Sequence, residues 1–403
     1  MRRLVVERDG SMGERRRRRA SRDGLSTAAG HVCFVALPLI VTGVWAIVAL
    51  RTHVFAGDFH YSFWPAGDRL LHGRSLYAAT PKDLAAGIGF PYSPAAALFL
   101  APFALLSIGV ADAVFALLNV VALVFSLRVL RVTDYRVFGA ALLWVPVMLA
   151  WQLANVTLLL GLGVALIWRY RDRPVVSGIL LGLLVSLKLF IWPVGLWLVA
   201  TRRYVACGWV LACVIVVNTA ALAVVGFDQI SPYLRLVKAV TGIQELNSYN
   251  LIALGQLHGM GRTAAYKLQF AIAGLAAACC FLLGRRRHDV AAFTVSVALC
   301  LLFAPVVHLH YLALLVVPLA LARPRLTPAW LFPVAMMVPI AVFPQHELVI
   351  VMATAVAVIA AALSRSSPFS GRQVAPPTEL VGISPAAGVP HGFLEPIVEP
   401  PAR

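Results

Sequence analysis

Four ionisable side chains stand out in this chain because each lies beside or inside a long apolar run. Asp58 follows the first apolar run, Lys188 interrupts another, and His308 and His310 stand at the start of a third. Ionisable groups next to lipid are costly, and they often mark a site for a membrane-embedded substrate. The two histidines have no third ligand at a recognisable spacing, so the sequence predicts no metal site and no cofactor.

A second group of candidates is aromatic or polar, and these side chains suit contacts with a substrate. They lie in the polar segment after the first apolar run, between two later runs, and in a long late loop. They are Tyr61, Trp64, Arg69, Gln152, Asn155 and Asn250.

Each candidate also has a purely structural interpretation. Asp58 has the position of a solvated loop acid, and Lys188 has the position of a side chain that extends to the membrane interface. The histidines can satisfy local backbone groups. Gln152 and Asn155 suit hydrogen bonds at helix ends, and Asn250 suits a helix cap. Taken singly, none of these residues identifies a function.

The composition places the site in a membrane protein. Of 403 residues, 61% are hydrophobic and only 13% are charged, whereas a soluble domain is about half apolar and a quarter charged. The net charge of +17 does not indicate nucleic-acid binding, because the basic residues flank apolar runs as the positive-inside rule requires. All six cysteines fall in predicted spans and form no disulfide or metal pattern.

The apolar runs predict an all-α, polytopic transmembrane bundle, residues 29–364, between two disordered tails. The basic tail, 1–28, contains Met12 as an alternative start, and the Pro-rich tail covers 365–403. Residues 30–50 are expected to be a retained first span. Further spans are expected at 109–130, 137–150, 154–169, 204–226, 264–284, 289–305, 309–322, 328–343 and 346–364.

The distribution of arginines fixes the expected topology. Placing most of them on the cytoplasmic side requires that the block 174–200 enter and leave on one side, as two short helices meeting near Lys188. It also requires that residues 95–107 form a juxtamembrane or re-entrant helix. The result is about 12 membrane helices with both termini cytoplasmic. The candidate residues then gather on the extracytoplasmic face, in and around an outer juxtamembrane loop region.

Considered together and in order, these segments resemble glycosyltransferase family 87, whose members are actinobacterial enzymes of the GT-C type. "GDFHYSFWPAGDRLLHGRSLY" and "FPYSPAAALFLAPFALL" are similar to its first loop, and "WQLANVTLLL" to its Gln-x-x-Asn element. "GILLGLLVSLKLFIWPVGLWLVATRR" is similar to its short-helix hairpin with a central Lys. "SYNLIAL" and "APVVHLHYLALLVVP" are similar to its later outer segments. The resemblance extends over about residues 30 to 364.

The resemblance implies a GT-C fold and transfer of a sugar, with inversion, from a polyprenol-phosphate donor to an acceptor hydroxyl. Asp58 is then the expected general base. Lys188, His310 and, more weakly, His308 are expected to bind the donor phosphate. The expected sugar is mannose and the expected acceptor a glycolipid or lipoglycan, on the outer face of the plasma membrane.

Two alternatives remain open from the sequence. The donor sugar can be arabinofuranose instead of mannose. In a different class of function, the chain can be a transporter or flippase for a lipid-linked sugar. Transporters often have internal repeats and ionisable residues at the middle of the membrane. This chain has no evident repeat, and its polar candidates gather on one side.

Overall fold

The computed structural model describes residues 28–80, 82–83, 89–335, 337–342 and 344–364. Every regular element in this part of the chain is helical. The two tails that were expected to be disordered lie outside the described residues, apart from residue 28. The choice between Met1 and Met12 as the start therefore also lies outside them. The all-α prediction is therefore confirmed for the residues that the structure describes.

The first half of the described chain contains thirteen helical elements, of which the η elements are short π or 3-10 helices. They are η1 (Val32–Ala36), α2 (Leu37–Arg51), η2 (Phe59–Phe63), α3 (Trp64–Leu71), α5 (Pro94–Leu100), η3 (Ala101–Leu105), α6 (Ile108–Val129), α7 (Tyr135–Leu142), α8 (Val145–Gln152), α9 (Thr157–Arg169), α10 (Pro174–Leu187), η4 (Leu189–Ile191) and α11 (Val194–Ala200).

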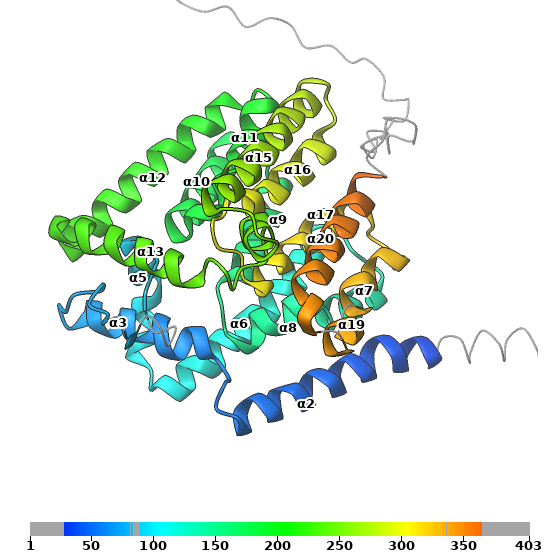
Figure 1. The fold of residues 1–403 in the computed structure, drawn as a ribbon, viewed down its shortest axis with the longest axis horizontal. Coiled ribbons are helices and arrows are strands. Elements are labelled where there is room, and N and C mark those ends of the chain that lie inside the picture. Colours follow the sequence, from blue (N-terminus) through cyan, green and yellow to red (C-terminus); the bar gives the residue numbers. More distant parts are fainter. Residues whose placement is uncertain (1–27, 81, 84–88, 336, 343, 365–403) are drawn as a thin grey trace, which may run out of the picture. The chain divides into compact units, whose positions relative to one another are not determined.

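The second half continues with α12 (Tyr204–Val225), η5 (Phe227–Gln229), α13 (Ile230–Gln244), α14 (Leu251–Leu257), α15 (Arg262–Arg285), α16 (Asp289–Phe303), η6 (Leu309–Leu315), α17 (Val316–Ala322), η7 (Pro328–Trp330), α18 (Phe332–Ala335), α19 (Met337–Val342), η8 (Pro344–His346) and α20 (Glu347–Leu363). Figure 1 shows their arrangement.

Four helices are long and apolar enough to cross a membrane: Ala28–Arg51, Ile108–Val129, Tyr204–Val225 and Arg262–Arg285. A fifth candidate is the pair α8 and α9, if the two helices count as one bent span. The chain is thus a polytopic helical membrane protein. The expected number of about 12 membrane helices is not confirmed, because several expected spans are short or broken.

The short and broken helices explain why the number of apolar runs in the sequence exceeds the number of membrane-spanning helices. Residues 309–322 form a 3-10 turn followed by a short α-helix, and 328–343 contain three short helical pieces. α16, from Asp289 to Phe303, is 15 residues long and is buried along most of its length. Its apolar composition therefore reflects a protein core. α12 is equally apolar and packs on α10, but only Ala206 and Ala221 are buried, as expected for a helix whose remaining surface faces lipid.

The helical hairpin expected within 174–200 is present. α10 ends at Leu187, Lys188 has an extended backbone, and a 3-10 turn leads into α11. The expected short helix within 95–107 is also present, as α5 followed by η3. Pro94 stands at its start, where a missing N–H costs nothing, and the Ser93 side chain caps it by accepting from Ala96 N.

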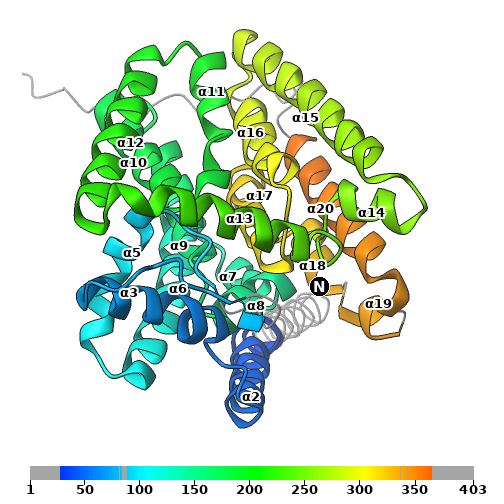
Figure 2. The ribbon, with the colours of Figure 1, turned by 60° about the vertical axis from the view of Figure 1, so that its left-hand side comes forward.

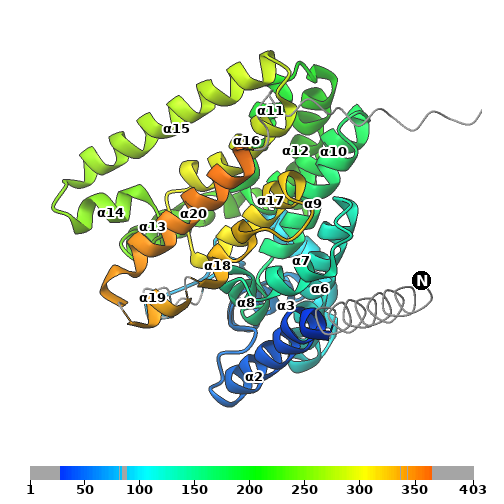
Figure 3. The same cartoon turned by 90° about the vertical axis from the view of Figure 1, so that its right-hand side faces the viewer.

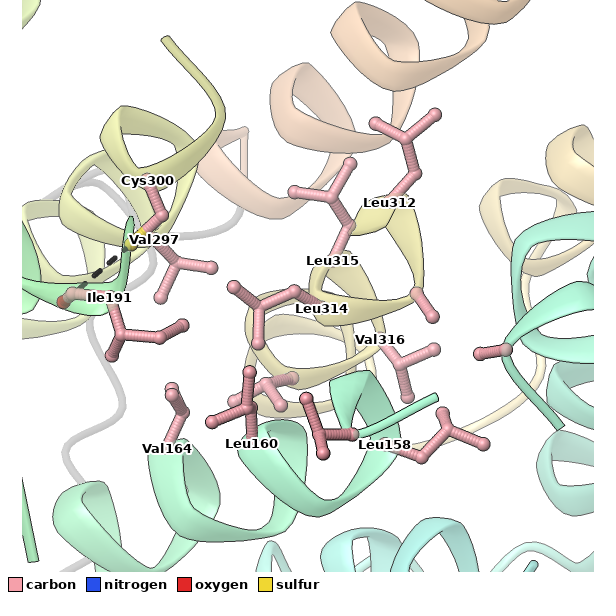
Figure 4. Packing of buried hydrophobic residues seen from close by; sticks show 14 of the residues in the cluster. Leu158, Leu160, Val164, Ile191, Val297, Cys300, Leu312, Leu314, Leu315 and Val316 are labelled. Atoms are coloured by element: carbon pink, nitrogen blue, oxygen red, sulfur yellow. Dashed lines mark hydrogen bonds between the residues drawn. The ribbon is translucent and has the colours of Figure 1, made fainter. Parts of the chain in front are cut away.

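The core beneath the hairpin joins elements that are distant in sequence. Figure 4 shows apolar side chains of α9, η4, α16, η6 and α17 packed together, among them Leu160, Ile191, Val297 and Leu314. The Cys300 thiol lies 3.9 Å from the Ile191 carbonyl oxygen. Because η4 follows Lys188 directly and η6 contains His310, this packing fixes both residues relative to each other.

α13 is amphipathic and runs from the end of α12 towards α14 (Figure 2). The half-buried side chains of its inner face recur at helical spacing: Tyr233, Val237, Val240, Thr241 and Gln244. Glu245, just past its end, accepts hydrogen bonds from Arg262, Gln256 and Tyr266. These bonds hold the end of α13 beside the first turns of α15.

The first and last long helices of the described chain, α2 and α20, differ in what they pack against. α2 packs on α7 and α8 near its own ends (Figures 1 and 3), and it exposes apolar side chains such as Leu39, Ile40 and Val44. α20 packs against α16 and α17 (Figure 3). α2 thus has the surface of a helix in lipid, whereas α16 and α17 lie inside the protein.

Candidate active site

Two neighbouring cavities lie beside α13: one between α13 and the hairpin of α10 and α11, the other between α13, η2 and the start of η6. The larger, of about 650 Å³, is lined mainly by apolar side chains, which come from the α10–α11 hairpin, α12, α13 and the segment after α16, together with Lys188. The smaller, of about 310 Å³, is lined by Asp58, Ser62, Asn155, Gln244, His310 and other residues. Both cavities are bounded by Pro91, Tyr92, Val240, His308 and Tyr311. These shared residues form the wall between an apolar chamber and a polar one.

Asp58 is held by the bend between α8 and α9. The two helices meet at 116°, and Ala154 in the bend has a φ of 48°, a left-handed conformation that is uncommon for alanine. The Leu153 carbonyl oxygen accepts from Asp58 N at 3.1 Å. The Asn155 amide donates to Asp58 Oδ2 at 2.6 Å, and Asn155 Oδ1 accepts from Thr157 N and Oγ1. Backbone and side chain of Asp58 are therefore both fixed.

The carboxylate of Asp58 still opens onto the polar cavity, because 35% of its side-chain surface is exposed. Desolvation by the surrounding protein raises the pKa of Asp58. The hydrogen bond from Asn155 and the positive charge of Lys188 partly offset this effect. A raised pKa makes the ionised carboxylate a stronger base. Asp58 thus combines fixed geometry, access to a cavity and increased basicity.

Lys188 lies on the wall of the apolar cavity, with its ammonium surrounded by aromatic rings. Its Nζ lies 3.9 Å from the ring centroid of Tyr311, 5.1 Å from that of Tyr92 and 5.3 Å from that of Phe190. Nζ is buried and has no hydrogen-bond partner among the described residues. Desolvation lowers the pKa of Lys188, and the negative charge of Asp58 acts in the opposite direction.

The two histidines lie beside Asp58 and Lys188. Their rings stack with centroids 5.5 Å apart. His310 Nε2 is 3.9 Å from Asp58 Oδ2, too far for a hydrogen bond, and this nitrogen is also buried without a hydrogen-bond partner in the described chain. Burial, assisted by Lys188, lowers the pKa of His308 to about 4. At neutral pH, His308 is therefore an uncharged donor or acceptor.

Asn250 does not line either cavity. Its side chain accepts from Ala253 N and so caps α14, and it donates to the Pro305 carbonyl oxygen at 2.8 Å. The neighbouring residues Ser248 and Tyr249 hydrogen-bond to the backbone of Val307. Asn250 therefore belongs to the contacts that hold the segment carrying His308, which is the capping role considered from the sequence.

Four other predicted site residues also lie outside both cavities. Gln152 accepts from the Trp45 indole at 2.7 Å and fixes α8 to α2. The Trp64 indole donates to the Leu106 carbonyl oxygen at 3.2 Å. The Arg69 guanidinium donates to the Leu76 carbonyl oxygen at 3.5 Å. Tyr61 is exposed and packs edge-on against His60. The structure therefore brings together Asp58, Asn155, Lys188, His308 and His310, but not these four.

Several cavity residues were not singled out from the sequence as site residues. Tyr92 and Tyr311 lie within the quoted segments "FPYSP" and "VVHLHY" but carried no assigned role. Ser62 and Gln244 also line the polar cavity, and nothing in its sequence context marks Ser62. The signal for Gln244 is its position on the inner face of the amphipathic helix α13.

Among the described residues, no three His, Cys, Asp or Glu side chains are grouped to hold a metal ion. That the reaction needs no metal and no cofactor remains a prediction. It is tested below with a chelator.

The fold and site define a class of protein: a helical membrane protein with a fixed carboxylate near a buried cation that has no hydrogen-bond partner among the described residues. The chain matches the model of glycosyltransferase family 87 over residues 90–318 and belongs to this family, so it is a membrane glycosyltransferase. The resemblance noted from the sequence is thereby confirmed. The matched region includes Lys188 and both histidines but begins after Asp58. Comparison with curated proteins and with solved structures gave no match.

Proposed function

We propose that this protein transfers mannose, with inversion, from a polyprenol-phosphate-mannose donor to a hydroxyl of a glycolipid or lipoglycan. The observation that carries the proposal is the pair of adjoining cavities, because one is apolar and reaches Lys188 while the other is more polar and contains Asp58. A lipid-linked sugar has the same division into an apolar chain and a polar head group.

The apolar cavity suits the lipid part of the donor. It is lined by side chains such as Val214, Leu222 and Leu234, and α12, which supplies two of them, has the surface of a helix in lipid. A prenyl chain in this cavity would bring its phosphate to Lys188, whose ammonium lacks any other hydrogen-bond partner in the described chain. His308, on the shared wall, can donate to the same phosphate.

The polar cavity suits the sugar and the acceptor hydroxyl. The acceptor oxygen attacks the anomeric carbon, its proton passes to Asp58, and the bond from that carbon to the phosphate oxygen breaks. The lipid phosphate leaves with the bonding electron pair and needs no proton from an acid, since it is stable as an anion. Attack from the side of Asp58 and departure on the side of Lys188 give inversion. Ser62 and Gln244 are available to hydrogen-bond sugar hydroxyls.

A membrane orientation follows from this assignment. Lipid-linked sugars are presented on the extracytoplasmic face, so we place the two cavities there and both chain termini in the cytoplasm, with the protein in the plasma membrane. The arginine distribution supports this orientation. Membership in a glycosyltransferase family supports an enzyme over a transporter of lipid-linked sugars.

The test is transfer by the purified protein in nanodiscs from a short-chain polyprenol-phosphate-mannose to a mannosylated glycolipid. The parent should form product, and Lys188→Ala should be slower by about a hundredfold, as for loss of one oxyanion donor. Lys238→Ala is the matched control, because Lys238 is exposed on α13. Activity with only the arabinose-bearing donor would correct the sugar. No transfer from either donor would overturn the proposal.

A further inference from the structure

The ammonium of Lys188 lies among three aromatic rings that come from three separate parts of the chain. Tyr92 precedes α5, Phe190 lies in η4 and Tyr311 in η6. The closest is Tyr311, with its ring centroid 3.9 Å from Nζ. Tyr311 and Phe190 also stack on each other, with centroids 5.1 Å apart.

These rings help to compensate for burying the charge. A buried ammonium normally hydrogen-bonds to several acceptors, and one without them is strongly disfavoured. Lys188 Nζ has no hydrogen-bond partner among the described residues. The face of an aromatic ring attracts a cation and does so more strongly when water is excluded. The rings therefore stabilise the charged form of Lys188 while leaving its N–H groups available.

We propose that Tyr311, Tyr92 and Phe190 form an aromatic cage that keeps Lys188 protonated and positioned in the apolar cavity, beside the wall between the two cavities, before the donor phosphate arrives. Tyr311 is then a positioning residue for sugar transfer. This inference rests on the proposed role of Lys188 in binding the phosphate. A cage of ring faces suits this purpose better than a carboxylate partner, because it does not compete with the phosphate for the N–H groups.

Other groups around Lys188 act on its charge and must be considered with the rings. Asp58 favours the charged form. His308 and His310 adjoin the same wall, and their protonation would repel the ammonium. The hydroxyls of Tyr92 and Tyr311 are neutral at physiological pH. Among the described residues, Asp58 is the one group that supplies an opposing charge, so removal of a ring should have a measurable effect on the protonation of Lys188.

The experiment measures that protonation directly. The chain has only four lysines, and replacing Lys82, Lys238 and Lys267 by arginine leaves Lys188 as the one lysine side chain. The rate at which fluorodinitrobenzene labels Lys188 is followed against pH by mass spectrometry of its peptide. Sugar transfer is measured on the same samples across the same pH range.

Tyr311→Leu should lower the apparent pKa of Lys188 by roughly one unit and reduce turnover at neutral pH by about tenfold. Tyr311→Phe retains the ring face and should restore both values. Tyr92→Leu and Tyr92→Phe provide a second pair, in case Tyr311→Leu fails to fold. Tyr170→Leu is the control, because Tyr170 contacts Arg169 and Arg173 and lines neither cavity.

The outcomes separate the cage from the proposed function. An unchanged Lys188 pKa in both leucine variants, with Lys188→Ala still about a hundredfold slower than the parent, would overturn the cage and leave the function standing. A lowered pKa with turnover unchanged at every pH would show that the charge of Lys188 is not used, which overturns both the positioning role of Tyr311 and the phosphate role of Lys188. Equal loss of activity in Tyr311→Phe and Tyr311→Leu would also exclude the cage, because the ring face is present in only one of them.

Discussion

Asn155 donates a hydrogen bond of 2.6 Å to Asp58 Oδ2, joining the bend between α8 and α9 to the segment that follows α2. Asn155 is itself fixed by two bonds from Thr157. The carboxylate therefore has one oxygen held by the protein and opens onto the polar cavity. This arrangement leads to the first two predictions.

Asp58→Asn should preserve folding and remove nearly all transfer. The amide has the shape of the carboxylate but cannot accept the acceptor's proton, and general-base catalysis contributes about a hundred- to ten-thousandfold. Turnover is measured in nanodiscs with saturating donor. Asp68→Asn is the control, because Asp68 pairs with Arg74 on the exposed side of α3. Activity of Asp58→Asn within a few-fold of the parent would exclude Asp58 as the base.

Asn155→Ala should slow transfer by roughly ten- to a hundredfold, the effect of losing a hydrogen bond to a charged group. Because the bond from Asn155 lowers the pKa of Asp58, its loss should also shift the acid limb of the pH–rate profile upward. A merely destabilised protein would lose activity without that shift. Asn247→Ala, on the exposed side of the loop after α13, should leave both rate and profile unchanged.

The parent enzyme should have a bell-shaped pH dependence of kcat/KM. Asp58 must be ionised for activity, and its pKa is raised. The acid limb of the profile should therefore lie at a higher pH than the pKa of an ordinary aspartate. Lys188 must be protonated for activity, and its pKa is lowered. The alkaline limb of the profile should therefore lie at a lower pH than the pKa of an ordinary lysine. Because the two groups interact, the apparent pKa of each limb is a property of the pair and not of one residue alone. In Lys188→Arg the alkaline limb should move upward, and an unmoved limb would assign it to another group.

Chelator should leave the parent enzyme active, because the proposed mechanism stabilises the leaving phosphate with Lys188 and hydrogen-bond donors. Transfer is compared after dialysis against EDTA and after addition of manganese or magnesium. A known metal-dependent glycosyltransferase in the same buffers verifies that the metal has been removed. Loss of activity in EDTA with recovery on adding manganese would contradict the metal-free mechanism.

Residues 51–91 and 227–263 should face the outside of the cell. Single cysteines at Ala78 and Asn247, both exposed, should be labelled in intact cells by an impermeant maleimide. A cysteine at Arg286 should be labelled only after permeabilisation. Exposed Cys33 and Cys279 are first replaced by serine. Protection of positions 78 and 247 until permeabilisation would reverse the orientation.

The sequence by itself determined the class of fold and the break at Lys188. An apolar content of 61% permits few structures other than a membrane-embedded helical bundle, since backbone groups must be satisfied within each segment. The arginines at the ends of the block 174–200 required a chain reversal inside it. Such features depend on local composition and charge, which are read directly from the chain.

The tertiary structure decided which candidates meet and which apolar runs are buried in protein. Asp58 and Asn155 are distant in sequence, and their contact depends on a bend of 116° that no single residue type requires. Gln152 resembles Asn155 in sequence context, yet it bonds to Trp45. The apolar runs of α12 and α16 look alike, but one is mostly exposed and the other buried. A hydrophobic sequence shows that a helix avoids water. It does not show whether the helix is surrounded by lipid or by protein, because both are apolar.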